Sequence, residues 1–315
     1  MGVRLLNSFL SSIESNGMKE VHLSDLHGKK IVIDASIYLY RFKFGNSLIE
    51  KMYLMCSILR YYCVHAIFVF DGSCDPDKTQ TLLARQKDKR KAGAQYRALQ
   101  SRLSCEDVPK SQQKKIKQRL NALGKRMVRV TFEDREAVIQ LLDAYGMCHM
   151  TAKGEADTVC CSLVRQGYAF ACMSEDTDMF AYGCPRVLKY LSLMKHTVVM
   201  YTLDDILEDL KMSSKEFRVF CAISGTDYNE SSCNIFHLYE LFGAYRKSTK
   251  AGFLQWLSKE GLLSVDHALL SDVIERFNLV PSSALEGCKY QTIRNKAFDP
   301  GKLEGFMGER GFLFP

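Results

Sequence analysis

Four acidic residues in one short stretch of the chain have the types and spacing of metal ligands. The stretch Gly154–Asp178 opens with Glu155 and Asp157 and closes with Asp176 and Asp178. Clustered carboxylate oxygens suit a hard cation such as Mg²⁺, which proteins bind through a few carboxylates, water and substrate phosphate. The same acids could instead complement a helix dipole and form a solvated turn. On this stretch alone, both interpretations stay open.

Two secondary-structure elements must position these acids. Residues 158–166 have a helical pattern that ends at a glycine, and residues 168–173 form an apolar run short enough to be a buried strand. The first pair of acids would then lie in the first turn of a helix, and the second pair in the loop after a strand. At such ends, two acids two positions apart can converge, whereas in mid-helix they diverge.

Three apolar runs of the chain each end in aspartate. Residues 31–33 precede Asp34, residues 66–70 precede Asp71, and residues 168–173 precede the acidic turn SEDTD. Helical patterns separate the runs, and a further acid, Asp227, follows a helical pattern over residues 215–223. This order predicts an α/β fold with a central, mostly parallel sheet flanked by helices and a site at the carboxyl ends of its strands. A hairpin is predicted over residues 187–203, and mainly helices from there to about residue 277.

A dense basic segment is inserted after the second aspartate strand. Residues 78–129 contain 16 Lys and Arg residues against three acids, a net charge of +13, whereas the rest of the chain has a net charge of −6. We predict one exposed basic helix, a turn near Pro109 and a second, amphipathic helix. A strongly basic segment on an otherwise acidic chain is typical of proteins that bind polyanions, and nucleic acid is the expected partner. The alternatives are a solvated face or a loop that is disordered without substrate.

Bulk composition excludes several classes of protein. The chain has 315 residues, of which 47% are hydrophobic and 25% charged, as expected for a globular protein. No apolar run is long enough to span a membrane, and no signal-peptide pattern opens the chain. The 12 cysteines have no zinc-site spacing and fall mostly in apolar runs (Cys56, Cys63, Cys160, Cys161, Cys172 and Cys221). They are interpreted as core residues of an intracellular protein in a reducing compartment.

The acids and the motifs around them resemble the flap endonuclease branch of the structure-specific 5′ nuclease (Rad2/XPG-like) superfamily. The motifs that carry the resemblance are MGVRLL, IDASIYLYRF, FVFDG, KRMVRVTFEDREAVIQLLDAYGM, GEADTVCCSLVRQG, SEDTDMFAYG, GTDYNES and PGKLEGFMGERGF. Each is weak by itself, but seven carboxylates occur in the family's order with similar spacing. The acidic block at residue 155 departs conservatively from the family's E-A-E-A, because Asp157 replaces a glutamate.

The resemblance implies a PIN-like 5′ nuclease fold in a single nuclease domain over residues 1–315. It also implies a helical arch over residues 78–130 and a helical duplex-binding region over residues 215–260. The implied activity is sequence-independent cleavage of DNA near the junction of a 5′ flap and duplex, with possible 5′ exonuclease activity. The implied cofactor is two Mg²⁺ ions per site, for which Mn²⁺ can substitute. The process served would be DNA replication, repair or recombination.

The resemblance also assigns roles to residues. One ion would be served by Asp34, Asp71, Glu155 and Asp157, and the other by Asp176, Asp178 and Asp227. Lys78 and Arg85 would stabilise charge on the scissile phosphate. Tyr40 would stack on a base beside the cleavage site, although a core tyrosine is the alternative. Gly2 would lie near the site and contact DNA. Further DNA contacts are expected from Lys87, Arg90, Lys125, Arg126 and Arg129.

Two departures limit the resemblance. The family's glycine-rich turn, which holds a potassium ion and grips duplex phosphates, corresponds here to SSCNIFHLYELF, which lacks glycine. The chain also ends at Pro315, without the basic tail and clamp-binding box of cellular members. We therefore expect a compact monomer without a sliding-clamp partner. Such a compact member would suit a large DNA virus or a minimal genome. If viral, it would act in the nucleus or at a cytoplasmic viral replication site.

Three rival functions share these sequence features. A four-way-junction resolvase or 5′ exonuclease of the same superfamily would carry the same seven acids. A non-catalytic DNA-binding scaffold would keep the basic segment but lose metal ligands. An RNA-directed nuclease with the same sheet topology is the third alternative.

Overall fold

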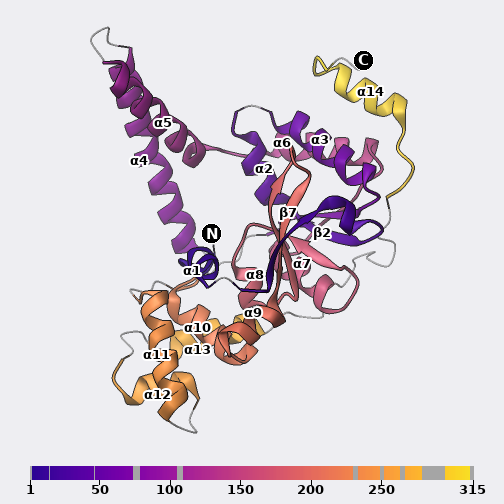
Figure 1. Ribbon diagram of the computed structural model, residues 1–315. Helices are drawn as coiled ribbons and strands as arrows, with labels where there is room; N and C mark the ends of the chain where they lie inside the picture. The colour runs from indigo at the N-terminus through magenta and orange to yellow at the C-terminus, as the bar shows by residue number, and fades with distance from the viewer. Residues whose placement is uncertain are drawn as a thin grey trace.

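The structure is a computed structural model built around one mixed sheet. It describes residues 2–13, 15–45, 47–73, 79–104, 109–229, 233–248, 252–262, 267–278 and 295–312. Within these residues, seven strands have the spatial order β1-β7-β6-β5-β2-β3-β4 (Figure 1). The strands are β1 (Met18–His22), β2 (Lys30–Asp34), β3 (His65–Phe70), β4 (Cys148–Thr151), β5 (Ala171–Met173), β6 (Arg186–Ser192) and β7 (Thr197–Thr202).

The three apolar runs that end in aspartate lie side by side at the centre of the sheet. Strand β2 pairs in parallel with β3 and with β5, and β4 and β6 extend the parallel part. The predicted hairpin is the antiparallel pair β6 and β7, and β1 adds to its outer edge. The predicted fold class is therefore confirmed. Strand β5 begins at Ala171, later than predicted, and β1 was not predicted.

Helices cover both faces of the sheet. The helices before the basic segment are α1 (Leu6–Ser12), α2 (Ala35–Lys43) and α3 (Leu48–Tyr61), with the short 3₁₀ helix η1 (Leu23–Leu26). The basic segment contains α4 (Thr79–Leu103) and α5 (Lys110–Met127). The later helices are α6 (Phe132–Ala144), α7 (Ala156–Arg165), α8 (Asp178–Ala181), α9 (Leu203–Leu210), α10 (Ser214–Ser224), α11 (Ile235–Ser248), α12 (Phe253–Lys259), α13 (His267–Asn278) and α14 (Pro300–Gly308).

Alternate residues of the central strands enter two separate hydrophobic cores. Val32 of β2 packs in the core shared with α1, α7 and α10, whereas Ile31 and Ile33 pack in the core shared with α2, α3 and α6. A parallel sheet covered on both faces explains why its strands appear as continuous apolar runs in the sequence. The single tryptophan, Trp256, also belongs to the first core.

The two helices predicted for the basic segment are present and pack side by side, extending away from the sheet (Figure 1). Their contact includes the buried residues Ala92, Ile116 and Leu123. Gly124 brings α5 against the ring of Phe44. A capping box at Thr131 and Asp134 then starts α6, so the chain re-enters the body of the protein within a few residues of α5.

One expectation about the cysteines is wrong. Cys56, Cys160, Cys161, Cys172 and Cys221 are buried, but Cys63 is exposed. Cys63 lies in the turn between α3 and β3, where it has a positive φ of 55°, so this turn interrupts the apolar run around it.

Among the described helices, none is long and apolar enough to cross a membrane.

Candidate active site

The carboxyl ends of β2 and β3 and the start of α7 bring three of the predicted acids to one edge of the sheet. Asp34 ends β2, and Asp71 follows β3. Asp71 Oδ1 accepts a hydrogen bond of 2.9 Å from the backbone N–H of Ala156, next to Glu155 at the helix N-cap. The N–H of Gly72 donates to the carbonyl of Gly154 at 2.7 Å, which joins the two loops. A Cβ at position 72 would lie 2.0 Å from the carbonyl oxygen of Ala152, so only glycine allows this approach.

Asp34 is a buried acid at the end of a central strand, with an exposed fraction of 6%. Burial, together with the negative charges of Asp71 and Asp176, raises the pKa of Asp34 to about 7. The hydroxyl of Ser174 donates to Asp34 Oδ2 at 3.2 Å and partly offsets this effect. Crowded, buried carboxylates favour the protonated form when no cation is near, and a bound cation would reverse that preference.

The turn that carries Asp176 and Asp178 is held by its own hydrogen bonds. The N–H of Asp176 donates to Ser174 Oγ at 3.1 Å, and the N–H of Asp178 donates to Asp176 Oδ1 at 3.1 Å. Gly2 lies against this turn with a positive φ of 83°, and a Cβ there would lie 2.1 Å from Asp176 Oδ1. The structure thus places Gly2 beside the acids, although the predicted contact of Gly2 with DNA stays a prediction.

The remaining acids come from α7 and from the segment after α10. Glu155 Oε2 accepts a hydrogen bond of 3.0 Å from the hydroxyl of Tyr228. Asp227, next to that tyrosine, forms an ion pair of 2.6 Å with Arg85 of α4. Asp157 is buried in the first turn of α7 and accepts the N–H of Thr158 at 2.7 Å. A hydrogen bond therefore joins the residue after Asp227 to the start of α7.

Among the predicted cations, Arg85 contacts a predicted acid directly. One turn further along α4, Lys89 places its ammonium 5.3 Å from the ring centroid of Tyr40. Tyr40 is 45% exposed, so the core-tyrosine alternative is wrong. Lys78 lies outside the described residues. The other predicted DNA contacts are all exposed: Lys87, Arg90, Lys125, Arg126 and Arg129.

Four residues around the acids were not identified from the sequence. Arg135 donates to the carbonyl of Asp71 at 2.9 Å, and Lys189 donates to the carbonyl of Glu175 at 2.8 Å. The other two are Ser174, which donates to Asp34, and Tyr228, which donates to Glu155. Ser174, Tyr228 and Arg135 belong to motifs already singled out, SEDTD, GTDYNES and KRMVRVTFEDREAVIQLLDAYGM, so their position was a usable signal. Lys189 has no such signal, because packing of the sheet alone brings it to the acids.

The donor set fits a magnesium site that is completed by water and substrate. Within the described ranges, no three His, Cys, Asp or Glu side chains lie close enough to enclose an ion by themselves. Mg²⁺ usually keeps several waters and uses one or two carboxylates together with substrate phosphates. Oxygen ligands and the raised pKa of Asp34 match this mode of binding. The acids that could hold such ions are Asp34, Asp71, Glu155, Asp157, Asp176, Asp178 and Asp227.

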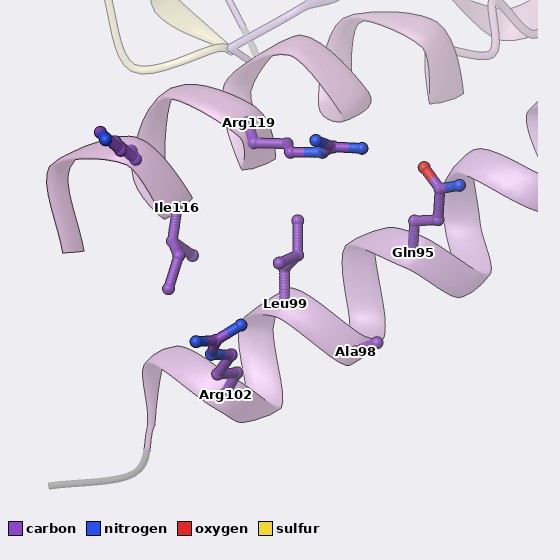
Figure 2. Close-up of a pocket in the computed structure, with 7 residues that line it drawn as sticks. Gln95, Ala98, Leu99, Arg102, Ile116 and Arg119 are labelled. Carbon is purple, nitrogen blue, oxygen red and sulfur yellow. The ribbon is translucent and has the colours of Figure 1, made fainter. Parts of the chain in front are cut away.

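The two basic helices enclose an open groove of about 450 Å³ (Figure 2). Leu99 and Ile116 point into it from α4 and α5. Three basic residues, Arg102, Lys115 and Arg119, are among those that line it. Arg102 also donates to Gln112 at 3.2 Å across the helix pair. The groove therefore combines an apolar floor with positive charge, the combination that suits single-stranded nucleic acid.

Two family models match the chain. Residues 1–92 match the XPG N-terminal domain and residues 146–227 match the XPG I-region, so together they cover more than half of the chain. The chain belongs to the XPG/Rad2 superfamily of 5′ nucleases. The segment between the two matches contains most of the basic helices of this 5′ nuclease.

Sequence relatives place the chain in the flap endonuclease branch of this superfamily, as predicted. It is 27% identical over 249 residues to Flap endonuclease 1 of Drosophila grimshawi, covering 73% of this chain and 61% of that protein. It is 24% identical over 343 residues to the probable RAD2-like endonuclease 369L of Invertebrate iridescent virus 6, covering 89% and 80% of the two chains. The matched part of the chain thus spans about three-fifths of the Drosophila relative. The predicted viral origin stays a prediction.

Solved structures share the fold of this chain at low sequence identity. The catalytic core of Rad2 in complex with DNA substrate aligns with a TM-score of 0.63 at 20% identity, covering 99% of this chain and 95% of that one. Flap endonuclease-1 from Methanococcus jannaschii aligns with a TM-score of 0.58 at 21% identity, covering 98% and 100%. The Holliday junction-resolving enzyme GEN1, in complex with product DNA and Mg²⁺, aligns with a TM-score of 0.62 at 16% identity, covering 96% and 72%.

Proposed function

We propose that this protein is a structure-specific, sequence-independent 5′ flap endonuclease that hydrolyses DNA phosphodiesters with two Mg²⁺ ions. The observation that carries the proposal is the contact between Arg85 of a basic helix and Asp227 beside the acids at the end of the sheet. A cation that can bind a phosphate thus lies beside carboxylates that can bind metal. Membership of the 5′ nuclease superfamily supports this activity, and the likeness to the catalytic core of Rad2 in complex with DNA substrate supports DNA as the substrate.

The proposed mechanism divides the chemistry between bound ions and side chains. Two Mg²⁺ ions would supply an activated water and would neutralise charge on the phosphate and the leaving oxygen. Asp34, Asp71, Glu155 and Asp157 would hold one ion, directly or through water, and Asp176, Asp178 and Asp227 would hold the other. Arg85 and Lys78 stabilise the charge that develops on the scissile phosphate, as fixed cations do in phosphoryl transfer.

The proposed domain roles follow from charge and position. The segment 78–130 acts as an arch that admits a flexible single strand and excludes duplex, so selection depends on shape and bendability. Tyr40 stacks on a base beside the cleavage site, since its ring is exposed and already contacts a cation of α4. Residues 215–260 contact the duplex, without the glycine turn of the family. The protein works as a monomer on branched DNA.

A panel of end-labelled substrates tests this function. The expected result is Mg²⁺-dependent cleavage near the junction of a 5′ DNA flap, supported also by Mn²⁺ and abolished by EDTA or by Asp176→Ala. The matched control, Asp272→Asn, removes a charge from an exposed residue of α13 and should cleave as the wild type does. Cleavage that persists in Asp176→Ala would contradict the two-ion assignment. A clear preference for RNA flaps over DNA flaps would contradict the proposed substrate class.

A four-way-junction resolvase is the second candidate. The fold similarity to GEN1, a Holliday junction-resolving enzyme, favours it. The same panel separates the two functions when nicked, gapped and four-way substrates are included. A tenfold or greater preference for the four-way junction would assign the protein to the resolvase class rather than the flap class.

A further inference from the structure

Lys189 is a fully buried lysine that lies behind the acidic turn of the candidate active site. Its exposed fraction is 0%, although it belongs to β6, whose neighbour β5 leads into that turn. Lysine is rarely buried completely unless its charge is compensated. Burial lowers the pKa of Lys189 to about 8, and the negative charges of Glu175 and Asp176 act in the opposite direction. An ordinary strand position in this core would hold an apolar side chain, so this lysine requires a specific explanation.

The ammonium of Lys189 holds the backbone immediately before Asp176. Its Nζ donates to the carbonyl of Glu175 at 2.8 Å. The side chain of Glu175 points elsewhere, because its Oε1 accepts from Arg41 at 3.2 Å and from the N–H of Tyr190 at 2.9 Å. One residue earlier, the N–H of Ser174 donates to the carbonyl of Leu188 at 3.1 Å. Strand β6 therefore fixes both residues that precede Asp176.

We propose that Lys189 is a positioning residue for the metal ligand Asp176, acting through the carbonyl of Glu175. The proposal rests on the proposed function, because it treats Asp176 as a metal ligand. With the Glu175 carbonyl held, the carboxylate of Asp176 stays at the edge where Asp34 also lies. Without this hydrogen bond, the part-buried carbonyl loses its partner and the turn can rotate to find another. Lys189 itself touches neither the substrate nor the ions.

Replacing Lys189 by methionine distinguishes a positioning role from a purely electrostatic role, because the two roles predict opposite changes in the affinity for a divalent cation. Methionine has a similar length and is apolar, and replacing a buried charge with an apolar group of similar volume is often tolerated. If Lys189 acted only through its positive charge, its removal would strengthen the binding of a divalent cation. If it positions Asp176, the same removal weakens binding, and loss of such supporting contacts typically costs about 10-fold or more in metal affinity.

The test is calorimetric titration of the full chain with Mn²⁺ in the absence of DNA. We expect Lys189→Met to bind Mn²⁺ about 10-fold or more weakly than the wild type, and Lys189→Arg, which keeps a donor and the charge, to recover most of the affinity. Lys195→Met, which removes an exposed lysine from the β6–β7 hairpin, should match the wild type. Circular dichroism and thermal melts establish that each variant is folded.

Equal or tighter Mn²⁺ binding by folded Lys189→Met would overturn the positioning role. If Lys189→Met does not fold, Lys189→Gln decides, because its amide is a neutral and shorter donor. Weaker binding by Lys189→Gln supports the proposal, and wild-type or tighter binding overturns it. Failure of the wild-type protein to bind Mn²⁺ at all would overturn the proposed function as well, so the two failures are distinguishable.

Discussion

Arg85 and Asp227 form an ion pair of 2.6 Å between the basic helix α4 and the acids at the end of the sheet. Their side chains are 36% and 16% exposed, so the pair is only partly screened by water. The same carboxylate is a proposed ligand of a metal ion, and the same guanidinium is a proposed contact of the scissile phosphate. A carboxylate oxygen that accepts from a guanidinium is a weaker ligand for a metal ion. Arg85 and the proposed metal ion therefore compete for Asp227.

Arg85→Gln tests this competition. We expect Mn²⁺ affinity to rise by a few-fold, because Asp227 loses a competing cation, while flap cleavage falls by about 100-fold, because a fixed charge at the phosphate is lost. Calorimetry measures the first effect and single-turnover cleavage the second. Arg97→Gln removes the same charge from an exposed position on α4 and serves as the control. A parallel fall of Mn²⁺ affinity and cleavage in Arg85→Gln would contradict the competition.

Gly2→Ala tests the support of the acidic turn by the amino-terminal segment. The added Cβ would lie 2.1 Å from Asp176 Oδ1, and the φ of 83° is unfavourable for alanine. We expect weaker Mn²⁺ binding and at least about 10-fold slower flap cleavage, since a small displacement of a ligand is costly. Gly28→Ala is the matched control, because Gly28 has a φ of 70° but no atom within 4 Å of the added Cβ. The expectation fails if both variants lose equally little activity.

Asp34→Asn tests the crowding of carboxylates through the pH dependence of stability. The pKa of Asp34 is raised to about 7, so the folded protein holds this proton more tightly than the unfolded chain does. The stability that this proton contributes is fully present below about pH 4 and is lost as the pH rises to about 7. In EDTA at pH 8, we expect Asp34→Asn to be more stable than the wild type by up to about 4 kcal/mol.

Urea denaturation at several pH values measures this difference, which should shrink toward pH 4. Asp272→Asn, an exposed substitution in α13, should follow the wild-type pH profile. If Asp34→Asn and the wild type lose stability in parallel between pH 4 and pH 8, crowding at Asp34 is not the cause. Asp34→Asn should lack cleavage activity at any pH, because a proposed metal ligand is lost.

The groove between α4 and α5 gives a prediction about DNA affinity. Replacing both Arg102 and Arg119 by glutamine should weaken binding of flap DNA and lower the slope of log K against log salt by about one for each lost phosphate contact. Anisotropy titrations of flap DNA at several salt concentrations measure this slope. Lys302→Gln, an exposed substitution in α14, should leave the slope unchanged. An unchanged slope in the double variant would show that the groove does not bind the flap.

The local pattern of the chain was sufficient to predict the centre of the fold. The runs before Asp34, Asp71 and SEDTD are buried on both faces of a sheet, so they appear as continuous apolar segments ending in acids. The basic helices follow from charge and a helical period. Strand β1 escaped prediction because its residues are half-buried or exposed without strict alternation, and its place depends on pairing with β7, about 180 residues away.

The sequence by itself determined which acids and cations are available, their order along the chain and the strands that precede them. The tertiary structure decided which of them touch: Arg85 with Asp227, 142 residues apart, and Gly2 with the turn at Asp176. It also decided that Tyr40 is exposed, that Cys63 lies in a turn and that Lys189 is buried. Side-chain type and spacing report local structure, whereas these contacts depend on how distant elements pack against the sheet, which no local pattern encodes.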